Sequence, residues 1–182
     1  DAAQTYQRVI DTIDPVPAGA YQRMAVLAFG SDLGRAQSML QLARDAEPDN
    51  PDTLFLLSEV AYANGEFDLA LESLRGFLTL MPESPDPSVL ARLALLEEAT
   101  VLNRAAQEDP STENRLALAD AFWRAGDREN AVGIYFDILT GDDPTHPVAL
   151  ARTGEAMLIA GSSQDAVALL ERAAAAAGSI EA

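Results

Sequence analysis

Few residues in this chain could carry out chemistry, and their spacing argues against an active site. His146 is the only histidine, and the chain has no cysteine. A lone histidine has no thiol to activate and no second imidazole with which to share a metal ion. The sequence therefore favours a surface role for His146 in the loop between two helices.

Two groups of acidic residues are the remaining candidates. The loop Gly141–Asp143 could attract a cation, but it lacks the spaced ligands and central glycine of a calcium-binding loop. Glu97 and Glu98 are adjacent, and adjacent residues project about 100° apart on a helix, so the two carboxylates do not face each other across a substrate. No glycine-rich phosphate loop or nucleophile elbow is present. We predict no catalytic residue, no metal and no cofactor, and hence a protein that is not an enzyme.

The charge of the chain narrows the classes of partner. It has 182 residues, of which 29 are acidic and 12 basic, so the formal net charge is −17. Such a chain repels nucleic-acid backbones and anionic membrane surfaces. All basic residues are arginine, which indicates a GC-rich bacterial genome. The absence of cysteine leaves the compartment open, periplasmic or cytoplasmic, and the apolar runs are too short to cross a bilayer.

The elements that position these residues follow a 34-residue repeat. Its clearest copy is 51–84, in which two amphipathic helical patterns flank Gly65 and Pro82 closes the unit. A step of 34 back from Ala70 reaches Ala36, and from Pro82 it reaches Pro48. Self-similarity at this period is typical of stacked helical repeats.

The phase of the repeat divides the chain. We expect one domain over 1–182, made of a half repeat 1–16, repeats 17–50 and 51–84, a degenerate single-helix unit 85–111, and repeats 112–146 and 147–180. No glycine or proline interrupts 88–109, and Glu98 replaces the small residue expected at a helix crossing. Because a half repeat lacks its packing partner, we expect the full-length protein to extend beyond Asp1.

The periodicity predicts an all-α fold of about ten helices, with the helix at 87–108 longer than the others and unpaired. The predicted helices cover 1–13, 17–29, 32–46, 51–64, 67–80, 87–108, 112–125, 128–140, 147–160 and 163–177. Small residues recur where paired helices should cross closely, at Ala36, Ala70, Ala131 and Ala166.

These anchors resemble the tetratricopeptide repeat family, bacterial type. In the unit 51–84 the family's large positions hold Leu54, Leu57, Ala61, Phe67 and Leu74, and its small positions begin with Ser58 and Ala70. Phe77 departs from the small residue usual at position 27. The resemblance implies a right-handed superhelical solenoid of antiparallel helix pairs, and it says little about function, because one fold hosts many roles.

The resemblance also implies a concave groove lined by the first helix of each pair. Carried over by position, the groove residues are Tyr21, Phe29, Phe55, Glu59, Tyr62, Asp120, Trp123, Arg124 and Glu155. Packing inside the core is the other interpretation of Phe29, Phe55 and Tyr62, and the sequence leaves both open. Exposure is favoured for Trp123, because tryptophan is rarely fully buried.

Aromatic anchors in a groove suit an apolar or helical peptide, and the acids favour basic flanks. The leading hypothesis is a non-catalytic scaffold or assembly factor that binds a partner protein, with a place in a membrane-associated complex. The alternative is a regulatory or substrate-presenting region of a larger enzyme or chaperone whose catalytic part lies N-terminal to this chain. The sequence names no partner and no oligomeric state.

Overall fold

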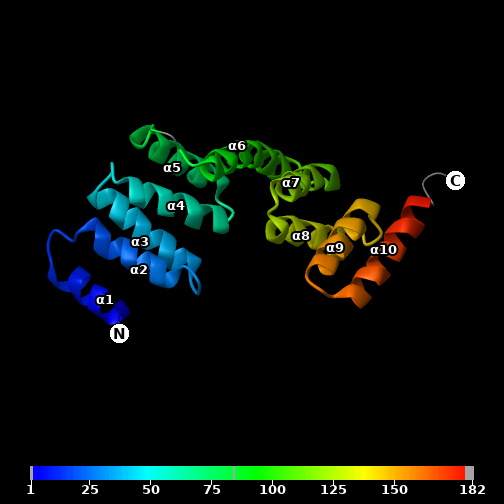
Figure 1. Ribbon diagram of the computed structural model, residues 1–182, viewed down its shortest axis with the longest axis horizontal. Helices are drawn as coiled ribbons and strands as arrows, with labels where there is room; N and C mark the ends of the chain where they lie inside the picture. The colour runs from blue at the N-terminus through cyan, green and yellow to red at the C-terminus, as the bar shows by residue number, and fades with distance from the viewer. Residues whose placement is uncertain (1, 84, 179–182) are drawn as a thin grey trace. The chain divides into compact units, whose positions relative to one another are not determined.

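The protein is built from helices throughout the part of the chain that the structure describes. The computed structural model describes residues 2–83 and 85–178, which form ten α-helices and one π-helical turn (Figure 1). The helices are α1 Ala2–Thr12, α2 Ala18–Ala28, α3 Leu33–Ala46, α4 Pro51–Ala63, α5 Phe67–Leu80, α6 Pro87–Glu108, α7 Thr112–Ala125, α8 Arg128–Asp137, η1 Ile138–Asp142, α9 Pro147–Ile159 and α10 Ser163–Gly178. The predicted all-α fold is confirmed, with helix ends within a few residues of the expected ones.

The helices gather into two compact units, Asp1–Glu97 and Glu98–Ala182, here named unit 1 and unit 2. In unit 1, α2 pairs with α3 and α4 pairs with α5, while α1 packs on α2 and α3 on α4 (Figure 1). In unit 2, α7 pairs with α8 and α9 pairs with α10, and α8 joins the two pairs. The expectation of a single domain with six repeat segments stays a prediction.

Small buried residues make these pairs possible. Ala36, Ala70, Ala131 and Ala166 are all completely buried, as the repeat predicts for close crossings. Gly154 on α9 serves the same purpose, because a Cβ atom there would lie 2.9 Å from Leu170 Cγ on α10. Larger side chains then fill the space beside each crossing, among them Leu40, Leu74 and Tyr135, which are also fully buried.

The turns within pairs are set by glycine and by capping side chains. Gly65, Gly126 and Gly161 have φ of +74°, +86° and +86°, a left-handed conformation that residues with a Cβ rarely adopt. The next helix often starts with a side-chain cap: Asp32 accepts from the Arg35 amide at 2.9 Å, and Asp127 from the Asn130 amide at 3.1 Å. These caps satisfy amides that the first helical turn leaves without a partner.

The predicted single helix at 87–108 is confirmed as α6, and the boundary between the two units falls within it. Leu95, Leu96, Ala99 and Thr100 form its buried side. Glu98, which replaces the expected small residue, is instead partly exposed and accepts a hydrogen bond from Arg124 at 2.6 Å.

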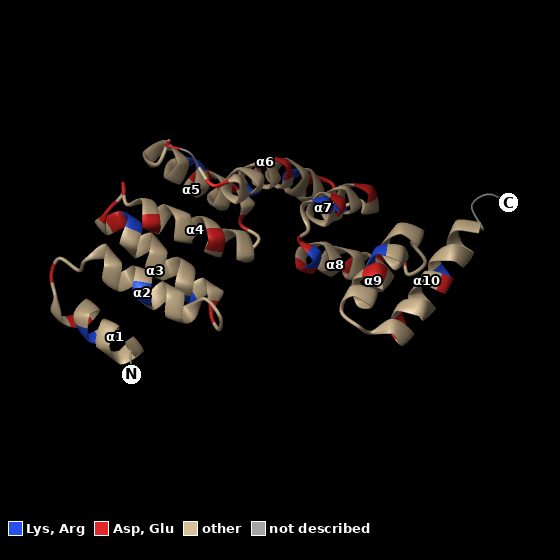
Figure 2. Ribbon diagram, viewed as in Figure 1, with Lys and Arg blue, Asp and Glu red and all other residues tan. Residues whose placement is uncertain are grey.

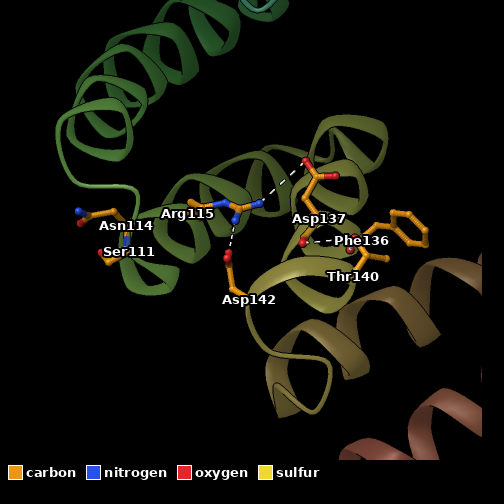
Figure 3. A network of polar contacts seen from close by, with 7 residues as sticks. All are labelled: Ser111, Asn114, Arg115, Phe136, Asp137, Thr140 and Asp142. Atoms are coloured by element: carbon orange, nitrogen blue, oxygen red, sulfur yellow. Dashed lines mark hydrogen bonds and ion pairs between the residues drawn. The ribbon is translucent and has the colours of Figure 1, made fainter.

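The last turn of the helix predicted at 128–140 differs from the expectation. The α-helix ends at Asp137 and continues as the π-helical turn η1 to Asp142. Figure 3 shows Arg115 of α7 directed at this segment, where it pairs with Asp142 and lies 3.9 Å from Asp137. Because two carboxylates on the widened turn meet one guanidinium, the contact helps to hold α7 against η1.

The crossing at Ala70 generates a first prediction. Ala70→Leu should lower the free energy of unfolding by about 1–3 kcal/mol, because the side chain is fully buried at the contact of α4 and α5 and has no space to grow. Chemical denaturation followed by circular dichroism measures the change. An unaltered unfolding curve would contradict the assignment of Ala70 to a close crossing.

A pair of glycines on neighbouring helices gives a second prediction. Gly154→Ala should destabilise the protein by about 1–3 kcal/mol, because its Cβ would meet Leu170 Cγ and, at 3.3 Å, the Ala166 carbonyl oxygen. The matched change Gly133→Ala on α8 places its Cβ in open space and should stabilise by up to about 1 kcal/mol through helix propensity. Equal effects of the two changes in thermal denaturation would refute close packing at Gly154.

Candidate functional site

An apolar hollow in unit 1 is lined by residues of α2 and α4, by Phe29 at the end of α2 and by Leu40 of α3. It has a volume of about 290 Å³ and is lined by Ala25, Val26, Phe29, Leu40, Leu56, Glu59 and Val60. Val26 and Phe29 are 52% and 43% exposed, which is unusual for large apolar side chains beside an open hollow. Exposed apolar groups gathered around a concavity are a common mark of a binding surface.

A second hollow of about 280 Å³ adjoins the first. It shares Val26 and Leu56 with it and adds Gln22, Arg23, Asp52 and Phe55. The two hollows together, here named the α2–α4 groove, have an apolar floor and polar groups at one end. Gln22 at this end donates hydrogen bonds to Asn50 Oδ1 at 3.1 Å and Thr53 Oγ1 at 2.8 Å, which joins α2 to the start of α4.

One carboxylate, that of Glu59, lines the apolar hollow. Arg92 of α6 reaches over α4, with its Nε 3.7 Å from Glu59 Oε1 and its guanidinium carbon 4.1 Å from the centre of the Tyr62 ring. Tyr62 is only 6% exposed and packs edge-on against Phe67 with ring centres 5.8 Å apart. A partner approaching this end of the groove would therefore meet Arg92 before the Tyr62 ring.

The predicted groove residues of unit 1 take different positions. Phe29 and Glu59 line the first hollow, and Phe55 lines the second while it packs on Phe77 with ring centres 5.2 Å apart. Tyr21 is half-buried on α2, and Tyr62 lies beneath Arg92. Their membership of a binding site stays a prediction.

Among the residues of this surface that sequence reasoning missed are Val26, Leu56 and Arg92. Val26 and Leu56 lie outside the family positions that usually face a groove, and they could have been noticed only as surplus apolar residues on the first helices. Arg92 comes from the degenerate unit, where the repeat phase gives no position to carry over. Its role depends on how α6 packs on α4, which the pattern of α6 alone does not indicate.

In unit 2, the predicted groove residue Trp123 lies at the centre of a cluster of aromatic and arginine side chains. Its ring is half-buried and packs edge-on against Tyr135, with ring centres 6.2 Å apart. The guanidinium carbons of Arg128 and Arg152 lie 4.0 Å and 5.1 Å from the centre of the Trp123 ring. Cations over an indole ring are attracted by the negative face of its π-system.

Asp120 and Glu155 also belong to this cluster, and their membership of a binding site stays a prediction. The Tyr135 hydroxyl donates to Asp120 Oδ1 at 2.5 Å, and Arg152 donates to Glu155 Oε2 at 2.9 Å. Burial raises the pKa of Tyr135, and the hydrogen bond to Asp120 and its negative charge add to the rise. Arg124, also predicted here, instead pairs with Glu98 and is largely exposed.

The same arrangement recurs in both units. An aromatic residue at the twelfth family position of a first helix, Tyr62 or Trp123, lies under an arginine from the following first helix, and that arginine also pairs with an acid. Arg92 and Arg152 each stand five residues after the proline that begins their helix. Arg92 of α6 thus contacts α4 in the way that Arg152 of α9 contacts α7.

The residues considered for catalysis are engaged in structural contacts. His146 caps α9, since its Nδ1 accepts from the Ala149 amide at 3.4 Å. Asp143 accepts from the Thr145 amide and hydroxyl, both at 2.9 Å, and these hydrogen bonds lower the pKa of its carboxyl. Glu97 accepts from Arg75 at 2.8 Å. Within 2–83 and 85–178, no group of three or more histidine or acidic side chains is placed to hold a metal ion.

The arrangement of paired helices agrees with a comparison of the sequence with known families. The model of the tetratricopeptide repeat matches residues 26–85 and 116–180. The chain belongs to the tetratricopeptide repeat family. The residues between the two matched regions include all of α6, where the repeat pattern degenerates. Proteins of this family are generally interaction modules for other proteins and peptides.

A comparison with solved structures found proteins to which this chain is similar at low sequence identity. YrrB, described as a tetratricopeptide repeat protein with an unusual peptide-binding site, is 17% identical, with 96% of this chain and 93% of that chain covered and a TM-score of 0.46. The P58(IPK) repeat domain is 20% identical over 86% of this chain and 50% of its own, with a TM-score of 0.46. MamA is 14% identical over 98% and 88%, with a TM-score of 0.41. The comparison with curated proteins found no match.

None of the helices in the described ranges is both long and apolar enough to cross a membrane. Charged residues are spread over both units, with acidic residues in the loops as well as on the helices (Figure 2).

The Tyr135 hydroxyl generates a third prediction. Its raised pKa means that the neutral hydroxyl stabilises the fold fully below about pH 10, the ordinary pKa of tyrosine, and that this stability is lost as the pH rises above it. Tyr135→Phe should therefore lower the free energy of unfolding at pH 8 by about 1–3 kcal/mol, since Asp120 loses a buried donor. The variant should also lose less stability than the parent between pH 9 and 11.

Urea unfolding at several pH values measures both effects. Tyr6, Tyr21 and Tyr62 are present in both proteins, so the comparison isolates the effect of the Tyr135 hydroxyl. Parallel stability profiles from pH 9 to 11 would show that the Tyr135 hydroxyl is not the titrating group.

Proposed function

We propose that this protein is a non-catalytic scaffold or assembly factor that holds a segment of a partner protein in the α2–α4 groove. The observation that carries the proposal is the pair of adjoining hollows with Val26 and Phe29 exposed beside them. Burying such side chains against a partner removes apolar surface from water, which is the main source of affinity in most protein interfaces.

The partner segment in this proposal is apolar at its centre and basic at its flanks. Asp52 and Glu59 lie at the groove, and the chain as a whole has a net charge of −17. An acidic surface speeds the approach of a basic partner and disfavours acidic ones. A place in a larger complex beside a membrane belongs to the same proposal, and identifying the captured partner would test it.

In this proposal the surface around Trp123 is a second binding surface, which lies in unit 2. Asp120, Trp123 and Glu155 lie in one cluster with two arginines, and Arg124 is exposed. Since Arg128 and Arg152 lie over the Trp123 ring, the partner in this proposal contacts the guanidinium groups rather than the indole face. We place these residues second to the α2–α4 groove, because large exposed apolar side chains line the groove.

Capture of partners by immobilised protein gives a fourth prediction. Val26→Ser should reduce the amount of captured protein at least about fivefold, because Val26 borders both hollows and a loss of about 1 kcal/mol weakens binding by that factor. The measurement is a pull-down from a bacterial extract with quantitative mass spectrometry. Val167→Ser is the matched control, since Val167 is 50% exposed on the second helix α10.

The outcome depends on the difference between the two variants. Equal capture by the parent and by Val26→Ser would exclude the α2–α4 groove as the main binding surface. Circular dichroism should show the same helical signal for all three proteins, because both valines are exposed and contribute little to the core.

A further inference from the structure

The hollow between α2 and α4 combines two features that a purely apolar binding pocket would not have. Six of its seven lining residues are apolar, and the seventh is Glu59. The volume of about 290 Å³ is at the lower end of the range of about 300–1,000 Å³ typical of small-molecule sites, so it suits a single long side chain.

From this arrangement we propose that the hollow is a specificity pocket for one lysine or arginine side chain of the partner, with the aliphatic stem packed on Val26 and Leu56 and the cationic head paired with Glu59. The proposal rests on the proposed function, which it deepens by naming the residue that the groove selects. Long basic side chains characteristically bury their methylene stems along apolar surface while their charged end meets an acid or water.

The charge of Glu59 is only loosely compensated within the protein. Its contact with Arg92 is 3.7 Å long, beyond hydrogen-bond distance, and the two side chains are 35% and 31% exposed. Such a pair contributes little to stability, so exchanging Arg92 for a partner's cation costs little. Arg92 would still retain its position over the Tyr62 ring, 4.1 Å from the ring centre.

Phe29 adds a second reason to expect a cation. It lines the same hollow and is 43% exposed, so a guanidinium or ammonium group could lie against its ring face while it approaches Glu59. A leucine or phenylalanine in the hollow would instead cover the Glu59 carboxylate without offering it a partner, which costs free energy.

The test uses the full chain and an array of acetylated nonapeptides. Eight positions of each peptide are random mixtures, and the central residue is fixed as one of the natural amino acids, norleucine or citrulline. Norleucine has an aliphatic stem without an ammonium group, and citrulline is a neutral isostere of arginine. We expect pools centred on lysine or arginine to bind at least about fivefold more fluorescently labelled protein than pools centred on norleucine or citrulline.

Three variants test whether the preference for lysine and arginine comes from the hollow. Glu59→Gln should abolish the preference for lysine and arginine, whereas Glu72→Gln, an equal change of charge at an exposed position of α5, should preserve it. Arg92→Met should increase binding of the basic pools about twofold, because it removes the competing cation and leaves an apolar side chain over Tyr62. This variant keeps the proposal testable even if Glu59→Gln disturbs the fold.

Each other outcome overturns the inference in a recognisable way. If leucine, phenylalanine or norleucine pools bind as well as basic ones, the hollow is a plain apolar pocket and the proposed function survives. If Glu59→Gln keeps the preference or Glu72→Gln loses it, the acidity of the whole chain is responsible. If a further set of nonapeptides copied from this chain binds better than every pool, the occupant is a second copy. If no pool binds above background, the proposed function fails as well.

Discussion

The structure depends on the close approach of paired helices at small residues. Ala36, Ala70, Ala131 and Ala166 are fully buried, and Gly154 has no space for even one more carbon atom. Because tightly packed interiors tolerate neither voids nor surplus atoms, these positions determine how near the helices lie and how the larger side chains beside them interlock. The apolar residues left outside such crossings are the ones that become available for binding.

The degenerate unit 85–111 shows the result where no small residue allows two helices to cross closely. Glu98 stands where a small residue would allow a crossing, and α6 continues as one helix to Glu108. Ion pairs of long side chains, rather than a close helix crossing, are found at Glu97 and Glu98. Arg75 pairs with Glu97 in unit 1, and Arg124 pairs with Glu98 in unit 2. Exposed pairs of this kind add little stability, which agrees with α6 being held chiefly by its buried Leu95, Leu96 and Ala99.

The chain has no lysine, and two of its arginines each contact both an acid and an aromatic ring. Arg92 meets Glu59 and Tyr62, and Arg152 meets Glu155 and Trp123. A planar, weakly hydrated guanidinium suits this double role better than an ammonium group. The consequence for function is that two aromatic residues expected to face a partner, Tyr62 and Trp123, lie beneath cations, while Val26 and Phe29 are exposed beside the groove.

The sequence alone determined the helices, the repeat phase, the long helix at 87–108 and the family, because apolar periodicity and small-residue anchors act locally and recur in register. It also placed Phe29, Phe55 and Glu59 on first helices. Tertiary structure alone decided which of the predicted residues share a hollow, that Tyr62 lies under Arg92, and that Val26 and Leu56 join the groove. It also decided that α8 continues into the π-helical turn η1, which meets Arg115. These features depend on contacts between residues about 30 positions apart, and the pattern of a single helix carries no information about its neighbour's side chains.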